Sequence, residues 1–274
     1  MLNSITVTLS GPPGCNHTMI VEAPPAQHQL DTQWLGRIAY ADAWALQKQI
    51  AAQRADGGCH DTLLLLEHPH TYTFGSRGRR AHQHLLVPRA ELEAAGIAVL
   101  DVDRGGDVTY HGPGQLVGYP ILCLAGYGLD ALQYVRALEE VLIDVLAGFG
   151  LAAGRVRHLT GVWAGDRKVA AIGTRVDING ISQHGFALNV ATDMRYFANI
   201  VPCGIRDRGV ISIAELLNRP VSINKVVPHV AAAFGRVFGV KVEGRRSQVE
   251  SLATLQPNAT PMTSQDSHGL ATFD

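Results

Sequence analysis

The segment "TGVWAGDRKVAAIGTRVDINGISQHGFALN", residues 160–189, predicts three neighbouring antiparallel strands. Gly165-Asp166 and Asn179-Gly180 are both typical of two-residue hairpin turns, because such turns need positive φ angles at their centres. The residues between the turns are mostly small, apolar or β-branched, as expected of strands that are at least half-buried. The segment therefore predicts an antiparallel sheet of at least three strands.

The two turns also predict which residues face each other across the strands. The first turn places Lys168 opposite Trp163, on a strand rather than in a mobile loop. The second turn, taken as a two-residue loop, places the strip "AIG" (171–173) opposite "FAL" (186–188), with 173 facing 186. Two strips of small residues side by side predict a groove between them.

Helices and further strands are expected on both sides of this segment. Apolar residues at helical spacing predict helices over 33–56, 129–149 and 224–238. Asp130 and Gln133 occupy the positions of an N-terminal capping box in the second helix. Ser212 and Glu215 have the same spacing and predict another, shorter helix.

The stretch "TLLLLEHPHTYTFG" predicts a buried strand, a break at His and Pro, and a short strand. Helices and mainly antiparallel strands in irregular order indicate an α+β fold, with mixed and largely antiparallel sheets packed against helices. We expect one domain over 31–245, a partly flexible extension over 1–30 and a disordered tail over 246–274. The tail is polar and rich in Ser, Thr and Gln.

The composition excludes several classes of function. The chain has 274 residues, 46% of them apolar, and a net charge of −1, which argues against a nucleic-acid-binding protein. We find neither a signal peptide nor an apolar run long enough to span a membrane. The four cysteines lack metal-finger spacing, which is typical of reduced thiols in the cytosol. We therefore expect a soluble, cytoplasmic protein.

Two residues are candidates for covalent chemistry. Cys203 lies between Pro202 and Gly204 in a loop that also carries Arg206 and Arg208. Positive charges favour the thiolate, which is the nucleophilic form, although a free cysteine is more often a small buried hydrophobic residue. Lys168 would ordinarily be a solvated edge residue. Its neighbours are small and apolar, so if its side chain points inward, its ammonium needs a partner such as a thiolate.

Histidines offer other possibilities. His111 and His184 each precede a glycine at a break in a strand, where backbone can approach a ligand closely, although a lone histidine is more often structural. His68 and His70 suggest a metal, but we find no third and fourth ligand at a suitable spacing, and we expect no metal. The basic stretch "GSRGRR" (75–80) lacks the surrounding pattern of a phosphate-binding loop.

A longer pattern resembles a known family. "RGGDVTYHGPGQLVGYP" (104–120) resembles the signature of the lipoyl(octanoyl) transferases. Two further blocks agree with that family: "GVWAGDRKVAAIGTRV" together with "HGFALNV", and then "NIVPCGI". The resemblance covers roughly residues 34 to 240.

The resemblance implies a fold shared with biotin and lipoate protein ligases and a catalytic dyad of Cys203 and Lys168. It makes 31–245 an acyltransferase domain and adds His184 as a supporting residue of the site. The substrate-binding residues that it implies are Arg104, Gly105, Gly106, Asp107, Val108, Thr109, Tyr110, His111, Ala171, Ile172, Gly173, Gly185, Phe186 and Ala187.

The activity implied is transfer of an octanoyl or lipoyl group from acyl carrier protein to a lysine of a lipoyl domain, through a thioester on Cys203. The acceptors would be lipoyl domains of 2-oxoacid dehydrogenases and the glycine cleavage H protein. No cofactor is expected, because the acyl group arrives on the phosphopantetheine of the carrier.

Two alternatives remain. One is an ATP-dependent lipoate or biotin ligase, which typically carries Gly-Gly-Gly where this chain has Arg104-Gly105-Gly106. The other is a non-catalytic module that binds acyl carrier protein. The presence of both Cys203 and Lys168 favours the transferase.

Overall fold

The computed structural model describes residues 4–10, 16–22, 28–76, 82–201 and 208–245. Within this part of the chain, eight strands form the main sheet in the order β13-β3-β4-β8-β12-β11-β10-β9. The strands β13, β3 and β4 run parallel to one another, and every later pair in that order is antiparallel. Their bounds are β3 Gln29–Arg37, β4 Asp61–Glu67, β8 Gln115–Ile121, β9 Gly154–Val156, β10 Leu159–Ala164, β11 Arg167–Val176, β12 Ser182–Asn189 and β13 Lys241–Arg245.

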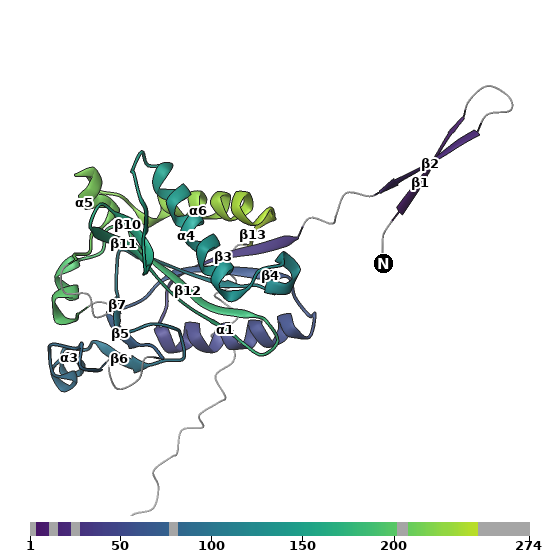
Figure 1. Ribbon diagram of the computed structural model, residues 1–274. Helices are drawn as coiled ribbons and strands as arrows, with labels where there is room; N and C mark the ends of the chain where they lie inside the picture. The colour runs from purple at the N-terminus through teal and green to yellow at the C-terminus, as the bar shows by residue number, and fades with distance from the viewer. Residues whose placement is uncertain (1–3, 11–15, 23–27, 77–81, 202–207, 246–274) are drawn as a thin grey trace, which may run out of the picture.

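Helices cover both faces of this sheet (Figure 1). Helix α1 (Tyr40–Ala55) packs on one face, against β8 and β12. Helices α4 (Ala131–Ala147) and α6 (Ile223–Phe238) pack against each other on the opposite face. The confirmed α+β architecture is thus a mixed sheet between two helical layers.

Strand β4 shows why the sheet is buried on both sides. Alternate side chains of a strand point to opposite faces. Leu63 and Leu65 belong to the core under α4 and α6, whereas Leu64 and Leu66 belong to the core under α1. A run of four leucines is therefore what a central strand with two covered faces requires.

A smaller sheet, in the order β6-β5-β7, lies beside the main one. Its hydrophobic cluster contains side chains of the helix α3 and of the 3-10 helix η2, together with Tyr72, Phe74 and Tyr110. A separate pair, β1 and β2, is antiparallel. The bounds of these and the remaining elements are β1 Ser4–Ser10, β2 Asn16–Glu22, β5 Thr71–Phe74, α3 Arg89–Ala94, β6 Ala98–Asp101, β7 Thr109–His111, η1 Leu124–Tyr127, η2 Met194–Asn199 and α5 Ile213–Leu217.

Most predicted elements are confirmed, and both capping boxes are present. The helix predicted over 33–56 is wrong at its start, because β3 continues to Arg37 and α1 begins at Tyr40. Trp34 packs toward the core under α4 and α6, and its neighbour Leu35 packs toward the core under α1. Adjacent residues on opposite faces are strand geometry, and the parallel pairing with β4 and β13 holds the segment in that form.

The first hairpin register is confirmed, with Trp163 paired to Lys168. The second is wrong by one residue, because Gly173 pairs with Gly185 rather than with 186. The connection is longer than two residues: Gly180 N donates to the Asp177 carbonyl, and Asp177 Oδ1 accepts from Asn179 N and Ile181 N. Asp177 thus organises a five-residue loop, and the strip 171–173 lies opposite 185–187.

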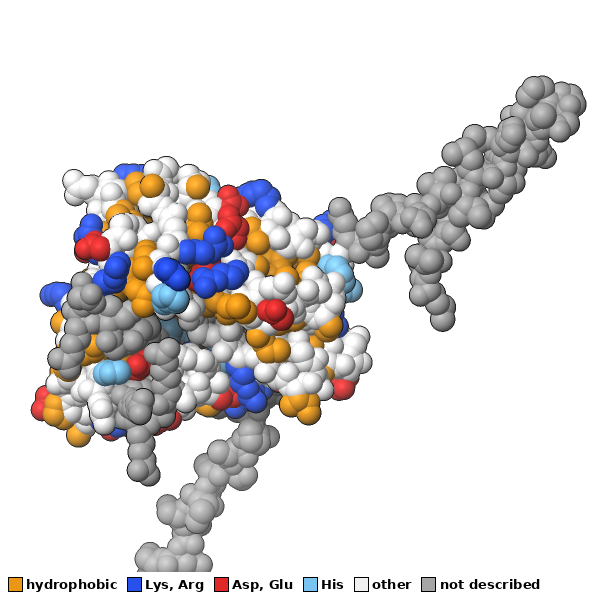
Figure 2. Space-filling view, viewed as in Figure 1, with side chains coloured by type: hydrophobic (Ala, Val, Ile, Leu, Met, Phe, Trp, Pro, Cys, Tyr) orange, Lys and Arg blue, Asp and Glu red, His pale blue; other side chains and the backbone are white. Residues whose placement is uncertain are grey.

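Charges of both signs are interspersed with hydrophobic side chains over the face shown in Figure 2. Among the described residues, no helix combines the length and apolar character needed to cross a membrane.

Candidate active site

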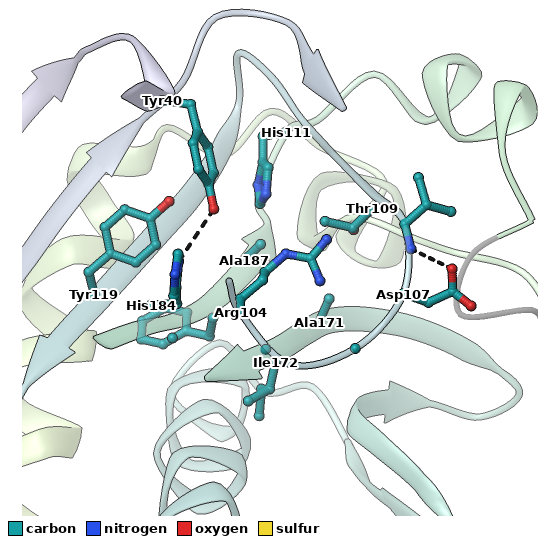
Figure 3. Close-up of a pocket in the computed structure, with 15 residues that line it drawn as sticks. Tyr40, Arg104, Asp107, Thr109, His111, Tyr119, Ala171, Ile172, His184 and Ala187 are labelled. Atoms are coloured by element: carbon teal, nitrogen blue, oxygen red, sulfur yellow. Dashed lines mark hydrogen bonds between the residues drawn. The ribbon is translucent and has the colours of Figure 1, made fainter. Parts of the chain in front are cut away.

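A narrow pocket lies between the sheet and the loop that leads into β7 (Figure 3). Strands β11 and β12 supply its apolar wall, and α1 and β8 each add a tyrosine. The lining residues are Tyr40, Arg104, Gly106, Asp107, Val108, Thr109, His111, Tyr119, Ala171, Ile172, Gly173, His184, Gly185, Phe186 and Ala187.

The apolar wall follows from the pairing of β11 and β12. Ala171 pairs with Ala187, and Ile172 pairs with Phe186. Gly173 lies where the loop before β7 packs closely against the sheet. A Cβ atom on Gly173 would stand 2.8 Å from the Gly105 carbonyl oxygen, so a larger residue there would push the loop away. Glycine at position 173 therefore permits the backbone of the loop to pack on the backbone of β11.

Arg104 reaches across the loop and holds its shape. Its Nη2 donates to the carbonyl and hydroxyl oxygens of Thr73, at 2.7 and 2.9 Å. Its Nη1 donates to the Gly105 carbonyl at 3.0 Å. Arg104 is buried. The guanidinium thus fastens the loop to β5 while its side chain forms part of the pocket wall.

His184 stands at the junction of the pocket with α1. Its φ of 56° is in the left-handed region, which is uncommon for a residue other than glycine. Its backbone N–H donates to Gln47 Oε1 at 2.7 Å. Its Nε2–H donates to the Asp103 carboxylate at 2.8 Å, and the Tyr40 hydroxyl lies 3.4 Å from Nδ1. Burial lowers the pKa of His184, against the opposing effect of Asp103. The imidazole is therefore neutral, with its proton on Nε2.

His111 belongs to a buried chain of hydrogen bonds. Its Nδ1–H donates to Gln115 Oε1 at 2.9 Å, and the Gln115 amide donates to Asn189 Oδ1 at 3.0 Å. Asn189 in turn donates to the Ile211 carbonyl. Burial holds the pKa of His111 well below its usual value, with further lowering by His68. The chain joins the pocket wall to the segment that follows residue 208.

Lys168 lies beside this pocket rather than in it. It lines an adjoining hollow, which shares Gly106, Asp107, Ile172 and Gly173 with the pocket. The side chain is buried, with 7% of the residue exposed, so Lys168 is not the solvated edge residue that a lysine in a hairpin ordinarily is. Lys168 N donates to the Gly209 carbonyl at 2.9 Å, and Ile211 N donates to the Lys168 carbonyl at 3.0 Å.

The structure brings most of the expected substrate-binding residues together, with two differences. Gly105 lines the hollow beside Lys168 instead of the pocket. Tyr110 is turned away from the pocket, into the core of the small sheet, because alternate residues of β7 face opposite sides. Its hydroxyl lies 2.6 Å from His70 Nδ1, and its ring stacks on Tyr196.

Cys203 lies outside the described residues, as do Arg77, Arg79 and Arg80 of the basic stretch. Val201, the last described residue before that segment, donates its N–H to the His84 carbonyl.

Two further residues of the pocket, Tyr40 and Tyr119, are not among those predicted from the sequence. Tyr119 falls inside the family signature, and the burial of both faces of β8 conceals any alternation that would mark it. Tyr40 is the first residue of α1 and carries no local signal. Both become part of the site only because α1 packs across β8 and β12.

The two histidines considered as metal ligands have other partners. His68 Nδ1–H donates to the Ile38 carbonyl, and its Nε2 is 2.8 Å from the Tyr119 hydroxyl. His70 contacts Tyr110 and Tyr196. Among the described residues, no group of three or more His, Cys, Asp or Glu side chains is arranged to hold a metal ion.

The chain belongs to the family described as the lipoyl protein ligase A/B catalytic domain, whose model matches residues 39–235. It is 49% identical over 226 residues to a protein named octanoyltransferase from Chloroflexus aurantiacus, covering 82% of this chain and 98% of that one. A protein of the same name from Solibacter usitatus is 52% identical over 204 residues, covering 74% of this chain and 90% of that one. The family resemblance and the acyltransferase class that it implied are thereby confirmed.

Solved structures give the same fold. A lipoate-protein ligase A bound with ATP has a TM-score of 0.64 at 19% identity, covering 83% of this chain and 93% of that chain. An archaeal bipartite lipoate protein ligase from Thermoplasma acidophilum has a TM-score of 0.63 at 19% identity, covering 83% and 91%. The expected architecture of the lipoate ligase type is confirmed.

Proposed function

We propose that the protein transfers an octanoyl group from acyl carrier protein to a lysine of a lipoyl domain. The transfer passes through a thioester on Cys203, and Lys168 acts with Cys203 as a catalytic dyad. The observation that carries the proposal is the pairing of Lys168 with the segment that follows Cys203. Gly209 and Ile211 both hydrogen-bond to the backbone of Lys168, and Cys203 precedes Gly209 by six residues. A buried lysine that lies beside a pocket with an apolar wall and is hydrogen-bonded to that segment supports the dyad.

The first step forms the acyl-enzyme. The Lys168 ammonium favours the thiolate of Cys203, because a nearby positive charge lowers the pKa of a thiol. The Cys203 sulfur bonds to the octanoyl carbonyl carbon, and the bond from that carbon to the sulfur of the carrier breaks. The departing carrier thiolate takes a proton from the Lys168 ammonium.

The second step forms the product. The ε-amine of the acceptor lysine bonds to the same carbonyl carbon, and the bond to the Cys203 sulfur breaks. The now neutral Lys168 takes the proton from the amine, which restores the ammonium and the thiolate. Conversion of a thioester into an amide is downhill, so ATP is not needed.

The pocket supports an eight-carbon chain as the group transferred. Its wall of Ala171, Ile172, Phe186 and Ala187 is apolar. Burial contributes roughly 0.8 kcal/mol for each methylene removed from water. His111 and His184 also line the pocket, and because burial keeps both imidazoles neutral, they add hydrogen-bonding groups without adding a charge of their own.

Intact mass spectrometry tests the proposal. The protein is incubated with octanoyl-acyl carrier protein in the absence of ATP, beside the variants Cys203→Ala and Lys168→Ala and the matched control Cys59→Ala. We expect one octanoyl adduct on the wild type and on Cys59→Ala, and none on Cys203→Ala. Transfer of free octanoate that requires ATP, with no adduct in its absence, would instead make the protein a ligase.

A further inference from the structure

A tryptophan lies directly against Lys168. The β10–β11 hairpin makes Trp163 and Lys168 cross-strand partners, and Lys168 Nζ stands 4.8 Å from the centre of the indole ring. Both are buried, with 3% of Trp163 exposed. A cation over an aromatic face is attracted by the ring quadrupole, most strongly for tryptophan and most strongly away from water. The ammonium is therefore held by the ring as well as by the strand beneath it.

The same ring contacts a second cation. Arg208 Cζ stands 5.7 Å from the centre of the Trp163 ring. Arg208 is the first described residue after the segment that contains Cys203, and Val210, two residues further on, bridges to Lys168. One indole thus contacts a cation from β11 and another from the end of the Cys203 segment.

The polar group of Trp163 does not explain its presence. Among the described residues, the buried Nε1–H of Trp163 has no hydrogen-bond partner. A buried donor without a partner is destabilising, and a phenylalanine would fill the site without one. The indole is favoured over phenylalanine by its stronger attraction for cations.

A bulge in β10 sets the position of the ring. The pairing with β11 shifts between Val162 and Trp163, which is where a bulge re-aims a side chain. The preceding Gly161 has a φ of 116°, and its N–H donates to the buried carboxylate of Glu139 at 3.1 Å. A Cβ atom on Gly161 would stand 2.6 Å from the Ala170 carbonyl oxygen, so glycine is required there.

We infer that Trp163 is a positioning residue for the acyl transfer, whose ring face fixes the Lys168 ammonium and the Arg208 guanidinium relative to each other. It thereby sets the end of the Cys203 segment against Lys168. This inference rests on the proposed function, in which Lys168 acts on the thiol and on the leaving group. Trp163 contacts Lys168 rather than substrate, so its effect passes through that lysine.

Fluorinated tryptophans at position 163 provide the test. One, two or three fluorine atoms on the indole withdraw electron density from the ring face while changing its shape little. The rate of acyl-enzyme formation from octanoyl-acyl carrier protein is measured at saturating donor for each, with the same series at Trp34, in β3, as the matched control. We expect the rate to fall with every added fluorine, by roughly tenfold over the series. We expect the KM for the donor to stay constant and the Trp34 series to be flat.

Conventional variants separate this role from simple packing. Trp163→Phe retains an aromatic face and should keep more of the rate than Trp163→Leu, which retains apolar bulk without a face. A rate that is independent of fluorination, while Lys168→Ala forms no adduct, would overturn the role of Trp163 and leave the proposed function standing. Full adduct formation by Lys168→Ala would overturn both.

Discussion

The histidines in and behind the pocket wall are held without charge by their surroundings. Burial lowers the pKa of His68 to about 4, and burial also lowers those of His111 and His184. In the proposed function, the acyl chain would therefore meet imidazole rings rather than imidazolium ions. The tautomers are set by partners outside the pocket, with Asp103 accepting from His184 and Gln115 accepting from His111.

The buried state of His68 predicts how stability depends on pH. Its pKa is about 4 when folded and 6.5 when unfolded, so the unfolded chain binds more protons between these values. The associated stability is fully present above pH 6.5 and is lost as the pH falls toward 4. We expect this residue alone to remove about 2 kcal/mol of unfolding free energy between about pH 7 and pH 5.

The measurement is urea unfolding at both pH values for the wild type and His68→Asn. Asparagine can still donate to the Ile38 carbonyl but does not titrate. The variant should lose about 2 kcal/mol less than the wild type over this range. An equal loss in both proteins would show that His68 is not the titrating group.

A second prediction for a single residue concerns the substitution of Gly173. Gly173→Ala places a methyl group 2.8 Å from the Gly105 carbonyl and 3.3 Å from Arg104 Cδ, so the loop before β7 must move off the sheet. We expect about 1–3 kcal/mol of destabilisation and a clear loss of octanoyl transfer. Thermal unfolding and a transfer assay measure both. The control is Gly244→Ala in β13, where nothing lies within 4 Å of the added atom; equal effects in the two variants would contradict the argument.

Among the elements, β10 depends on a carboxylate that belongs to α4. Glu139 is fully buried, and it accepts hydrogen bonds from Arg136, Arg155 and the backbone of Gly161. Removing one member of a buried charged group leaves the others without compensation. We expect Glu139→Gln to lower the free energy of unfolding by about 2 kcal/mol. This loss is smaller than that expected for a fully buried ion pair, because both arginines are partly exposed.

The adjacent residue offers a matched control. Glu140 is 52% exposed and makes a surface ion pair with Arg155. Glu140→Gln should change the unfolding free energy by less than about 1 kcal/mol, because exposed ion pairs contribute little. Urea unfolding of both variants measures the difference. Equal losses would mean that the buried carboxylate has no special part in holding β10.

The elements also show where sequence reasoning succeeds. Local signals predicted α4, α5, α6 and the pairing of Trp163 with Lys168, because caps and a tight turn act over a few residues. The register of β11 on β12 needed more, since the side chain of Asp177 lengthens a loop that Asn179-Gly180 alone predicts to be short. The helix predicted over 33–56 wrongly includes the end of β3, because the form of that strand depends on partners far along the chain.

The residues of the site likewise include some that local sequence patterns predict and some that depend on contacts between distant elements. The family signature predicted most of the residues that line the pocket. The corrected register sets 171–173 against 185–187, which are the two segments that the resemblance implied as substrate-binding. The direction of Tyr110, and the arrival of Tyr40 from α1, depend on how layers pack. No pattern within one segment carries that information.

For the molecule as a whole, the order of strands predicts where the fold is most resistant to opening. Strands β8 and β12 lie in the interior of the sheet and are buried at every position, whereas β9 is a short edge strand. We expect the amides of β8 and β12 to exchange with solvent deuterium most slowly and those of β9 among the fastest. Hydrogen exchange followed by mass spectrometry measures this, and comparable protection of β9 and β8 would contradict it.

The parallel pairing of β3 with β13 has a consequence for biosynthesis. Leu30 pairs with Val242, so this contact joins residues more than two hundred positions apart. A ribosome releases β3 well before β13, so one side of β3 lacks its partner while the residues between these two strands are being made. Contacts of such long range slow folding, and an unpaired strand edge is a template for association with other chains. The nascent domain is therefore most exposed to misassembly in the interval before its last strand emerges.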